Sequence, residues 1–247
     1  MNKKVKFAFI IVLVVLMVYA GGFLIWSQQT FKPTSQLNHL VNIKQEVQHK
    51  DDLYIYKPKS KDIKDGFIFY PGAKVEPEAY SYWAKKLSDE GYLVIIPEMP
   101  LNLALLGKNK AEEAMRLYPS INKWYIGGHS LGGPASATYS LKHQEKIQGL
   151  IFLGSYTTES SDLSKAKFPL LSITGERDGL STPAKIKGSK KFNPIDTTYH
   201  VIKGGNHAQF GMYGTQAGDK KARISNQKQQ DEIVKTLLSW LNKQNQR

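Results

Sequence analysis

The sequence predicts an α/β protein, in which a mostly parallel β-sheet carries helices on both faces and one N-terminal apolar helix precedes it. Short continuous apolar runs, typical of strands buried on both faces, alternate with amphipathic helical segments along the chain. A longer apolar run stands apart from this alternation, near the start. The 247 residues, 41% of them hydrophobic, suffice for one domain of ordinary size with a substantial core.

The N-terminal segment has the features of a membrane anchor. Three lysines between residues 3 and 6 precede an apolar run, Phe7–Trp26. A helix of about 20 residues crosses the hydrocarbon core of a bilayer, and flanking lysines stay in the cytoplasm. We therefore expect residues 1–6 in the cytoplasm, a single-pass anchor over 7–26, and the remainder outside the cell. A cleaved signal peptide is the alternative, but the apolar run continues past the small-residue cleavage site at 18–20.

The rest of the chain divides into a short tether and one domain. Residues 27–36 are polar and contain Pro33, so we expect them to tether a domain over 37–247. The first two expected strands flank a polar turn at 49–52 and predict a hairpin. The strands expected in the domain are 41–47, 53–56, 66–70, 91–97, 124–126, 147–153, 168–174 and 197–202. The expected helices are 77–90, 101–118 with a break near Gly107, 134–143, 183–192 and 227–241.

Composition excludes several kinds of chemistry. The chain has no cysteine, which excludes disulfides, thiolate catalysis and zinc–thiolate sites. Its formal charge of +13 is spread over many lysines, and no nucleic-acid-binding motif accompanies it, so we expect no nucleic-acid partner. Such a surface suits anionic lipid or a polyanionic envelope, although solubility is a simpler explanation for the lysines.

A serine lies among glycines at the end of a predicted strand. Residues 128–132, Gly-His-Ser-Leu-Gly, match the pattern G-x-S-x-G between an apolar strand and a helix that begins with small residues. A sharp strand-to-helix turn exposes the serine hydroxyl, and larger flanking residues would collide with the neighbouring strand and helix. A phosphate-binding loop is the alternative, but its G-x-G-x-x-G or G-K-[ST] spacing is absent. The pattern predicts that Ser130 is a nucleophile.

A nucleophilic serine needs a base, and the base needs an orienting carboxylate. In this arrangement the chain order is serine, acid, histidine. Asp178 lies in the loop after the strand LLSIT, and Glu176 is the alternative acid nearer the strand end. His207 follows the strand YHVIK by a short loop, whereas His200 lies inside that strand and is expected to be structural. We predict a catalytic triad of Ser130, Asp178 and His207.

The developing oxyanion needs hydrogen-bond donors. The backbone N–H of Leu131, directly after the serine, is the first candidate. The second should come from the loop after the strand at 66–70, where Gly72 permits a close approach and the N–H of Ala73 is the expected donor. An ordinary Pro-Gly turn is the alternative.

Together these motifs resemble the α/β-hydrolase family from about residue 41 to residue 241. The resemblance rests on FIFYPGA, GYLVIIPEMP, WYIGGHSLGG, LLSITGERDGLSTP and IKGGNHAQFG. The sequence is most similar to a small capless branch related to dienelactone hydrolases. Two departures are Ser130 where those enzymes use cysteine, and Tyr70-Pro71 where many members have His-Gly. The resemblance implies hydrolysis of an ester, lactone, thioester or amide through an acyl-serine intermediate, without metal or organic cofactor.

The substrate is predicted only by class. Because the segment 154–167 is too short for a large lid, we expect an open pocket for a small or lipid-like acyl compound. Glu98, Met99 and Tyr156 follow strand ends and are expected to contact the substrate, with loop packing as the alternative. Two other functions remain open: an acyltransferase that uses the same triad, and a non-catalytic binding protein on this scaffold.

Overall fold

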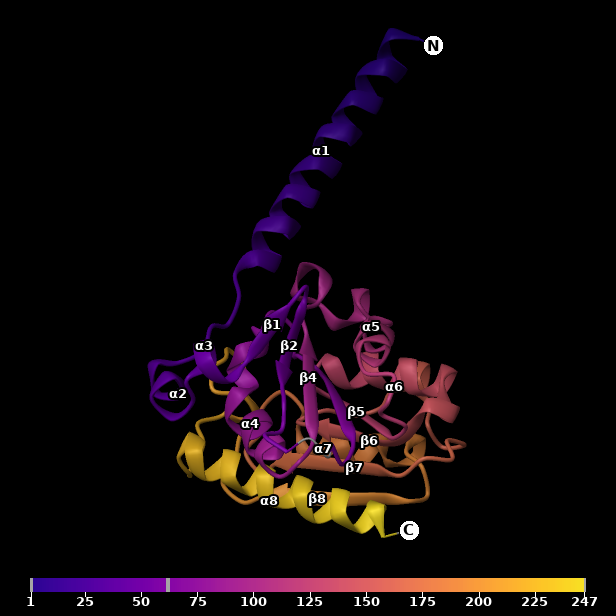
Figure 1. Cartoon of the computed structure of the whole chain (residues 1–247). Helices are drawn as coiled ribbons and strands as arrows, with labels where there is room; N and C mark the ends of the chain where they lie inside the picture. Colours follow the sequence, from indigo (N-terminus) through magenta and orange to yellow (C-terminus); the bar gives the residue numbers. More distant parts are fainter. Residues whose placement is uncertain (1, 61–62, 247) are drawn as a thin grey trace.

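The computed structural model describes residues 2–60 and 63–246 and confirms the α/β sheet architecture. Its eight strands lie in the order β1-β2-β4-β3-β5-β6-β7-β8. The strands from β4 to β8 along this order pair in parallel, whereas β1 and β2 are antiparallel at one edge (Figure 1). The strands are β1 Gln48–Lys50, β2 Leu53–Tyr56, β3 Gly66–Tyr70, β4 Leu93–Pro97, β5 Trp124–His129, β6 Ile147–Leu153, β7 Leu170–Gly175 and β8 Thr197–Ile202.

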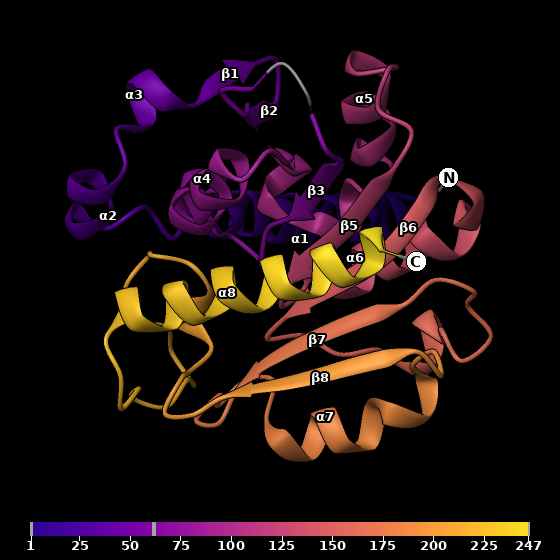
Figure 2. The same cartoon turned by 60° about the horizontal axis from the view of Figure 1, so that its bottom comes forward.

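Helices cover both faces of the sheet, because the inner strands are apolar on both sides. Phe67 and Phe69 of β3 pack in one core cluster with α4 and α8, and Ile68 and Tyr70 pack in another with α5 and α6. Figure 2 shows α8 lying across one face of the sheet. The helices are α1 Lys3–Gln28, α2 Ser35–Leu40, α3 Ile43–Glu46, α4 Ser81–Asp89, α5 Lys110–Leu117, α6 Gly132–Lys142, α7 Pro183–Ser189 and α8 Asn226–Asn245.

One predicted element is wrong, and another is confirmed only in part. The expected strand over 41–47 contains the short helix α3, which begins after Asn42. The Asn42 amide N–H and side chain bond Glu46 and Gln45, 3.0 and 2.8 Å away, so local hydrogen bonds outweigh the alternating pattern. The helix expected over 101–118 does break at Gly107, as predicted. It is α-helical only after the break, in α5, and the 3₁₀ helices η2 (Pro100–Asn102) and η3 (Ala104–Leu106) precede the break. A hairpin forms at the predicted place, but its first strand is β1, which overlaps the predicted turn at 49–52, and not 41–47. Lys50 of β1 lies opposite Leu53 of β2.

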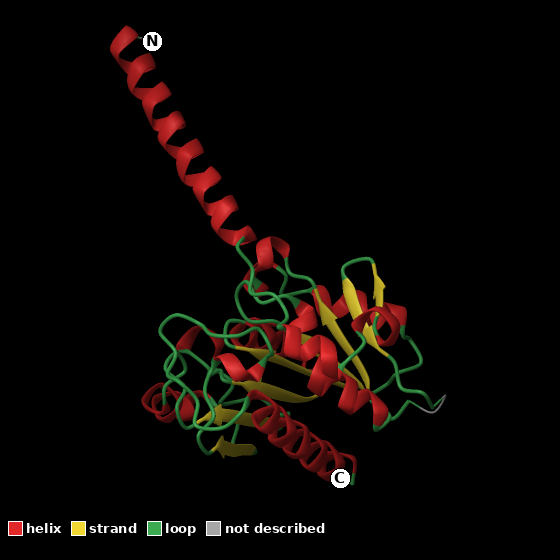
Figure 3. Cartoon of the chain, turned by 90° about the vertical axis from the view of Figure 1, so that its left-hand side faces the viewer, coloured by secondary structure: helices red, strands yellow, loops and turns green. Residues whose placement is uncertain are grey.

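Helix α1 projects away from the rest of the chain (Figures 1 and 3). Its most apolar stretch is unburied, with a mean hydropathy of 2.8. Among the described residues it is the one helix long and apolar enough to cross a membrane, a test that a signal sequence near the N-terminus would also pass. The C-terminus lies at the opposite end of the molecule (Figure 1).

Candidate active site

Ser130 lies in the sharp turn between β5 and α6. Its φ is +50°, in the left-handed region that non-glycine residues seldom adopt. A Cβ on Gly128 would overlap the Gly132 carbonyl group, and a Cβ on Gly132 would overlap the Tyr70 carbonyl oxygen, so both positions require glycine. The Ser155 hydroxyl holds the turn by donating to the Ser130 carbonyl oxygen over 2.7 Å. The backbone is thus fixed in the conformation that a nucleophilic serine adopts in such turns.

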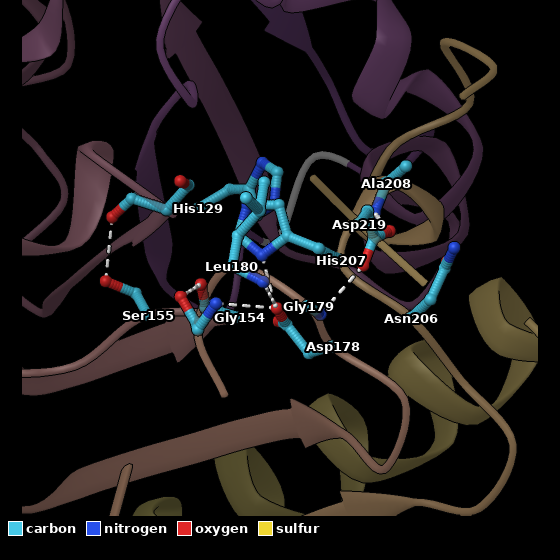
Figure 4. A network of polar contacts seen from close by, with 12 residues as sticks. His129, Gly154, Ser155, Asp178, Gly179, Leu180, Asn206, His207, Ala208 and Asp219 are labelled. Carbon is cyan, nitrogen blue, oxygen red and sulfur yellow. Dashed lines mark hydrogen bonds and ion pairs between the residues drawn. The ribbon is translucent and has the colours of Figure 1, made fainter. Parts of the chain in front are cut away.

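Asp178 and His207 form a buried pair at the same edge of the sheet. Both side chains are fully buried, and His207 Nδ1 lies 2.8 Å from Asp178 Oδ2. The other carboxylate oxygen accepts the backbone N–H groups of Leu180 and Ser181, 2.8 and 2.6 Å away (Figure 4). Three hydrogen bonds therefore fix the carboxylate, and it in turn orients the imidazole ring.

The competing acid and histidine have other partners. Glu176 accepts the Gly204 N–H over 2.8 Å, which ties the loop before His207 to the end of β7. His200 Nε2 lies 2.8 Å from Glu232 on α8, away from Asp178. Of the two acids considered, the structure therefore brings Asp178 into contact with His207.

His129 lies between the serine turn and the catalytic histidine candidate, His207. The His129 ring, on the residue directly before Ser130, lies 4.6 Å from the His207 ring, centroid to centroid. His207 Nε2 is buried, and neither it nor Ser130 Oγ makes a hydrogen bond within the described residues. Catalytic hydrogen bonds are often long in proteins without substrate. The structure thus contains the acid–base contact but not the base–nucleophile hydrogen bond.

A second buried network, which the sequence did not reveal, joins the β3 loop to the serine turn. The Gly72 N–H donates to the Tyr80 hydroxyl over 2.9 Å, and that hydroxyl lies 2.9 Å from His129 Nδ1. Burial raises the pKa of Tyr80, so its hydroxyl stays protonated. Burial, followed by the nearby His207, holds the pKa of His129 well below its usual 6.5. The hydrogen bond therefore joins a neutral phenol to a neutral imidazole ring.

The loop after β3 offers one free donor beside the serine. The Gly72 N–H donates to the Tyr80 hydroxyl. The N–H groups of Ala73 and Leu131, in contrast, donate to no acceptor within residues 2–60 and 63–246. Tyr70 pairs with Gly128 across β3 and β5, which brings this loop to the serine turn. The role of Ala73 and Leu131 as oxyanion donors stays a prediction.

The comparisons with known proteins agree with the fold. Residues 66–231 match the model of the alpha/beta hydrolase family. The chain belongs to the α/β-hydrolase family. No curated protein matches the sequence of this hydrolase.

Solved structures share the fold at low sequence identity. A putative lipase from Acinetobacter baumannii is 12% identical with a TM-score of 0.66, covering 86% of this hydrolase and 96% of the lipase. A predicted CIB-like hydrolase from Thermoplasma acidophilum is 15% identical with a TM-score of 0.62, covering 81% and 98% of the two chains. A thermophilic esterase from Thermogutta terrifontis is 12% identical with a TM-score of 0.58, covering 78% and 93%.

Asp219 also supports the site, although it lies in a segment without a recognisable motif. One of its carboxylate oxygens accepts the Gly179 N–H, and the other accepts the Ala208 N–H, each over 2.9 Å. Gly179 follows Asp178, and Ala208 follows His207, so Asp219 joins the acid loop to the histidine loop (Figure 4).

The three predicted substrate contacts have other neighbours in the hydrolase. Glu98 lies 3.4 Å from His49 Nε2 on β1, and Met99 is buried among core residues. The Tyr156 ring is half-buried, with the Lys185 ammonium group 5.9 Å from its centroid. Within the described residues, no hydrogen bond, ion pair or ring contact joins these three to the Ser130 region, and their role stays a prediction. The described residues also contain no cluster of three His, Asp or Glu side chains that could hold a metal ion.

The neutral state of His129 predicts a pH dependence of stability. Its pKa is lower in the folded chain than in the unfolded one, so the unfolded state binds the extra proton first as pH falls. The stabilisation is complete above the unfolded pKa of about 6.5 and is lost below it, by up to about 1.4 kcal/mol per pH unit. His129→Asn, which keeps an acceptor for Tyr80, should remove this slope between pH 6.5 and 5. Denaturant unfolding of both chains measures it, and equal slopes would contradict a buried neutral His129.

Proposed function

We propose that this hydrolase cleaves carboxylic esters through an acyl-enzyme intermediate on Ser130, with lactones, thioesters and amides as chemically related substrates. The observation that carries the proposal is the buried Asp178–His207 pair beside a serine in the left-handed turn conformation. A serine in this conformation, next to an oriented imidazole, is the arrangement needed for acyl transfer. The esterase and the lipase among the similar structures support the ester as the substrate class.

The proposed reaction has two stages, acylation and deacylation, and His207 moves the protons in both. His207 Nε2 takes the hydroxyl proton as Ser130 Oγ attacks the carbonyl carbon, while Asp178 stabilises the imidazolium through Nδ1. The N–H groups of Leu131 and Ala73 donate to the tetrahedral oxyanion. The imidazolium then protonates the leaving alcohol, and the acyl group stays on Ser130. His207 next activates a water molecule, which releases the acid and restores the serine.

We further propose that α1 anchors the protein in the cell membrane. Residues 1–6 lie in the cytoplasm, residues 7–26 cross the membrane, and the catalytic domain faces outward. The three lysines before the apolar run support this direction, and the unburied surface of α1 supports a helix in lipid. The substrate then comes from outside the cytoplasm, as a small or lipid-like acyl compound.

A series of p-nitrophenyl esters tests the proposed reaction. The full chain in detergent should release p-nitrophenol, with a rate that depends on acyl length and with the free acid as the product. Mass spectrometry of the products, with an added alcohol as acceptor, separates hydrolysis from acyl transfer. A folded chain that cleaves no ester would support the binding-protein alternative. A product that is mainly the ester of the added alcohol would support the acyltransferase.

A further inference from the structure

The last turn of α1 is fixed to two loops of the catalytic domain. The Lys74 ammonium group donates to the Trp26 carbonyl oxygen over 3.2 Å and lies 4.3 Å from the centroid of the Trp26 ring. The Asn102 side chain donates to the Ser27 carbonyl oxygen over 3.0 Å, and Ser27 itself is fully buried. The lysine, the asparagine and the buried serine together attach the end of the anchor to the domain.

The residues after α1 continue this attachment. The Phe31 N–H donates to the Lys74 carbonyl over 2.6 Å, and the Glu76 N–H donates back to the Phe31 carbonyl over 3.1 Å. The Thr30 hydroxyl donates to the Glu76 carboxylate over 2.6 Å. Further on, the Thr34 N–H reaches the Met212 carbonyl over 2.8 Å. Residues 27, 30, 31 and 34 are thus hydrogen-bonded to the domain, and these bonds hold the end of α1 against it.

Two of the three loops that hold the anchor carry residues of the candidate active site. Lys74 directly follows Ala73 in the loop after β3, and Met212 lies in the loop after β8, which contains His207. The third residue, Asn102, lies in the loop after β4. All three loops start at the carboxyl ends of parallel strands, the edge where ligands bind in such sheets. The anchor therefore leaves the domain from the edge that carries the serine.

The backbone of this attachment is unusual. Lys74, Leu101 and Asn102 have φ values of +61°, +52° and +57°, and they are three of the five non-glycine residues with positive φ in the described chain. The Lys74 N–H donates to the Asn102 carbonyl over 2.8 Å and so joins the two loops. Such conformations persist only where the surroundings enforce them. The attachment is a formed structure and not a loose contact.

The length of the anchor determines where the loops that contact it lie relative to the bilayer. The run Phe7–Trp26 spans about 30 Å as a helix, which equals the hydrocarbon thickness of a bilayer. Tryptophan at the end of such a run lies among the lipid headgroups. Lys74 and Asn102, bonded to residues 26 and 27, then lie at the same level. Shortly after Asn102 in the chain, Leu105 and Leu106 in η3 form an exposed apolar pair, with exposed fractions of 42% and 55%.

We propose that α1 holds the sheet edge that carries Ser130 against the outer leaflet of the membrane. We propose also that the substrate is an ester of an amphiphile that resides in this membrane. Leu105 and Leu106 insert among the lipid chains, and the ester group reaches Ser130 from the bilayer without crossing water. This inference rests on the proposed function, in which Ser130 is the nucleophile and α1 is a retained anchor. The headgroup of this substrate can be that of a phospholipid or of another lipid, because both classes offer the same acyl chains to the apolar residues.

Single cysteines test the orientation, because the natural chain has none. Leu105→Cys probes the proposed contact, and Ile195→Cys is the matched control, an apolar residue 101% exposed in the loop that leads into the amino end of β8. Each full-length variant is labelled with a small fluorophore in phosphatidylcholine–phosphatidylglycerol vesicles that contain a quencher-bearing phospholipid. Strong quenching at 105 and weak quenching at 195 is expected. Equal quenching at both positions would overturn the orientation, whether or not the protein is an esterase.

Kinetics then separate the two proposals. Leu105→Gln combined with Leu106→Gln should lower hydrolysis of a long-chain fluorogenic ester in the same vesicles by about tenfold, because two apolar contacts with lipid are lost. Hydrolysis of a water-soluble acetate ester should not change, and Ile195→Gln should change neither rate. Equal loss on both esters, or no loss on the vesicle ester, would overturn the membrane-facing site while ester hydrolysis stands. A wild-type chain inactive on both esters would overturn the proposed function itself.

Discussion

Ser130→Ala is expected to lower kcat for ester hydrolysis by roughly 10³- to 10⁶-fold while the fold stays intact. The Ser130 side chain makes no hydrogen bond within the described chain, so its loss removes chemistry and no structural bond. The neighbouring Ser155 hydroxyl cannot replace it, because it already donates to the Ser130 carbonyl oxygen. Initial rates with a p-nitrophenyl ester and a circular dichroism spectrum measure the two parts of the result.

Ser155→Ala is the matched control for this serine. It removes one hydrogen bond that supports the turn, which costs about 1 kcal/mol and about tenfold or less in rate. A Ser130→Ala chain that kept activity within tenfold of the wild type would contradict a nucleophilic serine at this position.

Asp178→Asn is expected to lower kcat by about 10⁴-fold. The Leu180 and Ser181 N–H groups both point at one oxygen of this side chain, so the asparagine oxygen has to occupy that place. Its NH₂ group then faces His207 Nδ1 and donates to it. The imidazole proton moves to Nε2, the nitrogen that has to accept the proton of Ser130, and the base is lost.

Glu176→Gln is the control for the acid, since Glu176 is the alternative acid in the same loop. A glutamine oxygen can still accept the Gly204 N–H, so the rate should stay within about tenfold. The measurement is kcat as a function of pH for the wild type, Asp178→Asn and Glu176→Gln. A large loss in Glu176→Gln with little loss in Asp178→Asn would reverse the assignment of the acid.

Much of the fold and of the candidate site can be predicted from the sequence, because both depend on local patterns. The inner strands are largely apolar, and the residues of chemical interest lie in the loops that follow strand ends. Since parallel strands end at one edge, Asp178 and His207 can be expected to meet although 28 residues separate them, and the structure contains their hydrogen bond. The two glycines beside Ser130 are required by contacts of the kind that the motif implies.

Other features depend on contacts that no local pattern encodes. Tyr80 lies 49 positions before His129, and its sequence neighbourhood indicates only an apolar helix face. Asp219 lies in a polar loop, where its bonds to Gly179 and Ala208 have no sequence signature. The helix α3 replaced an expected strand because the Glu46 carboxylate accepts the Asn42 backbone N–H and the Asn42 side chain bonds Gln45, which closes a short turn locally. The attachment of α1 likewise joins residues 26 and 27 to residues far along the chain.

Covalent labelling tests the central claim most directly. The full chain in detergent is treated with a fluorophosphonate, which reacts with serine hydroxyls activated by a base, and the modified residue is identified by mass spectrometry of its peptides. One adduct is expected, on Ser130, and it should disappear in a folded His207→Ala chain. An adduct on another serine, or no adduct on a folded wild-type chain, would contradict Ser130 as the nucleophile.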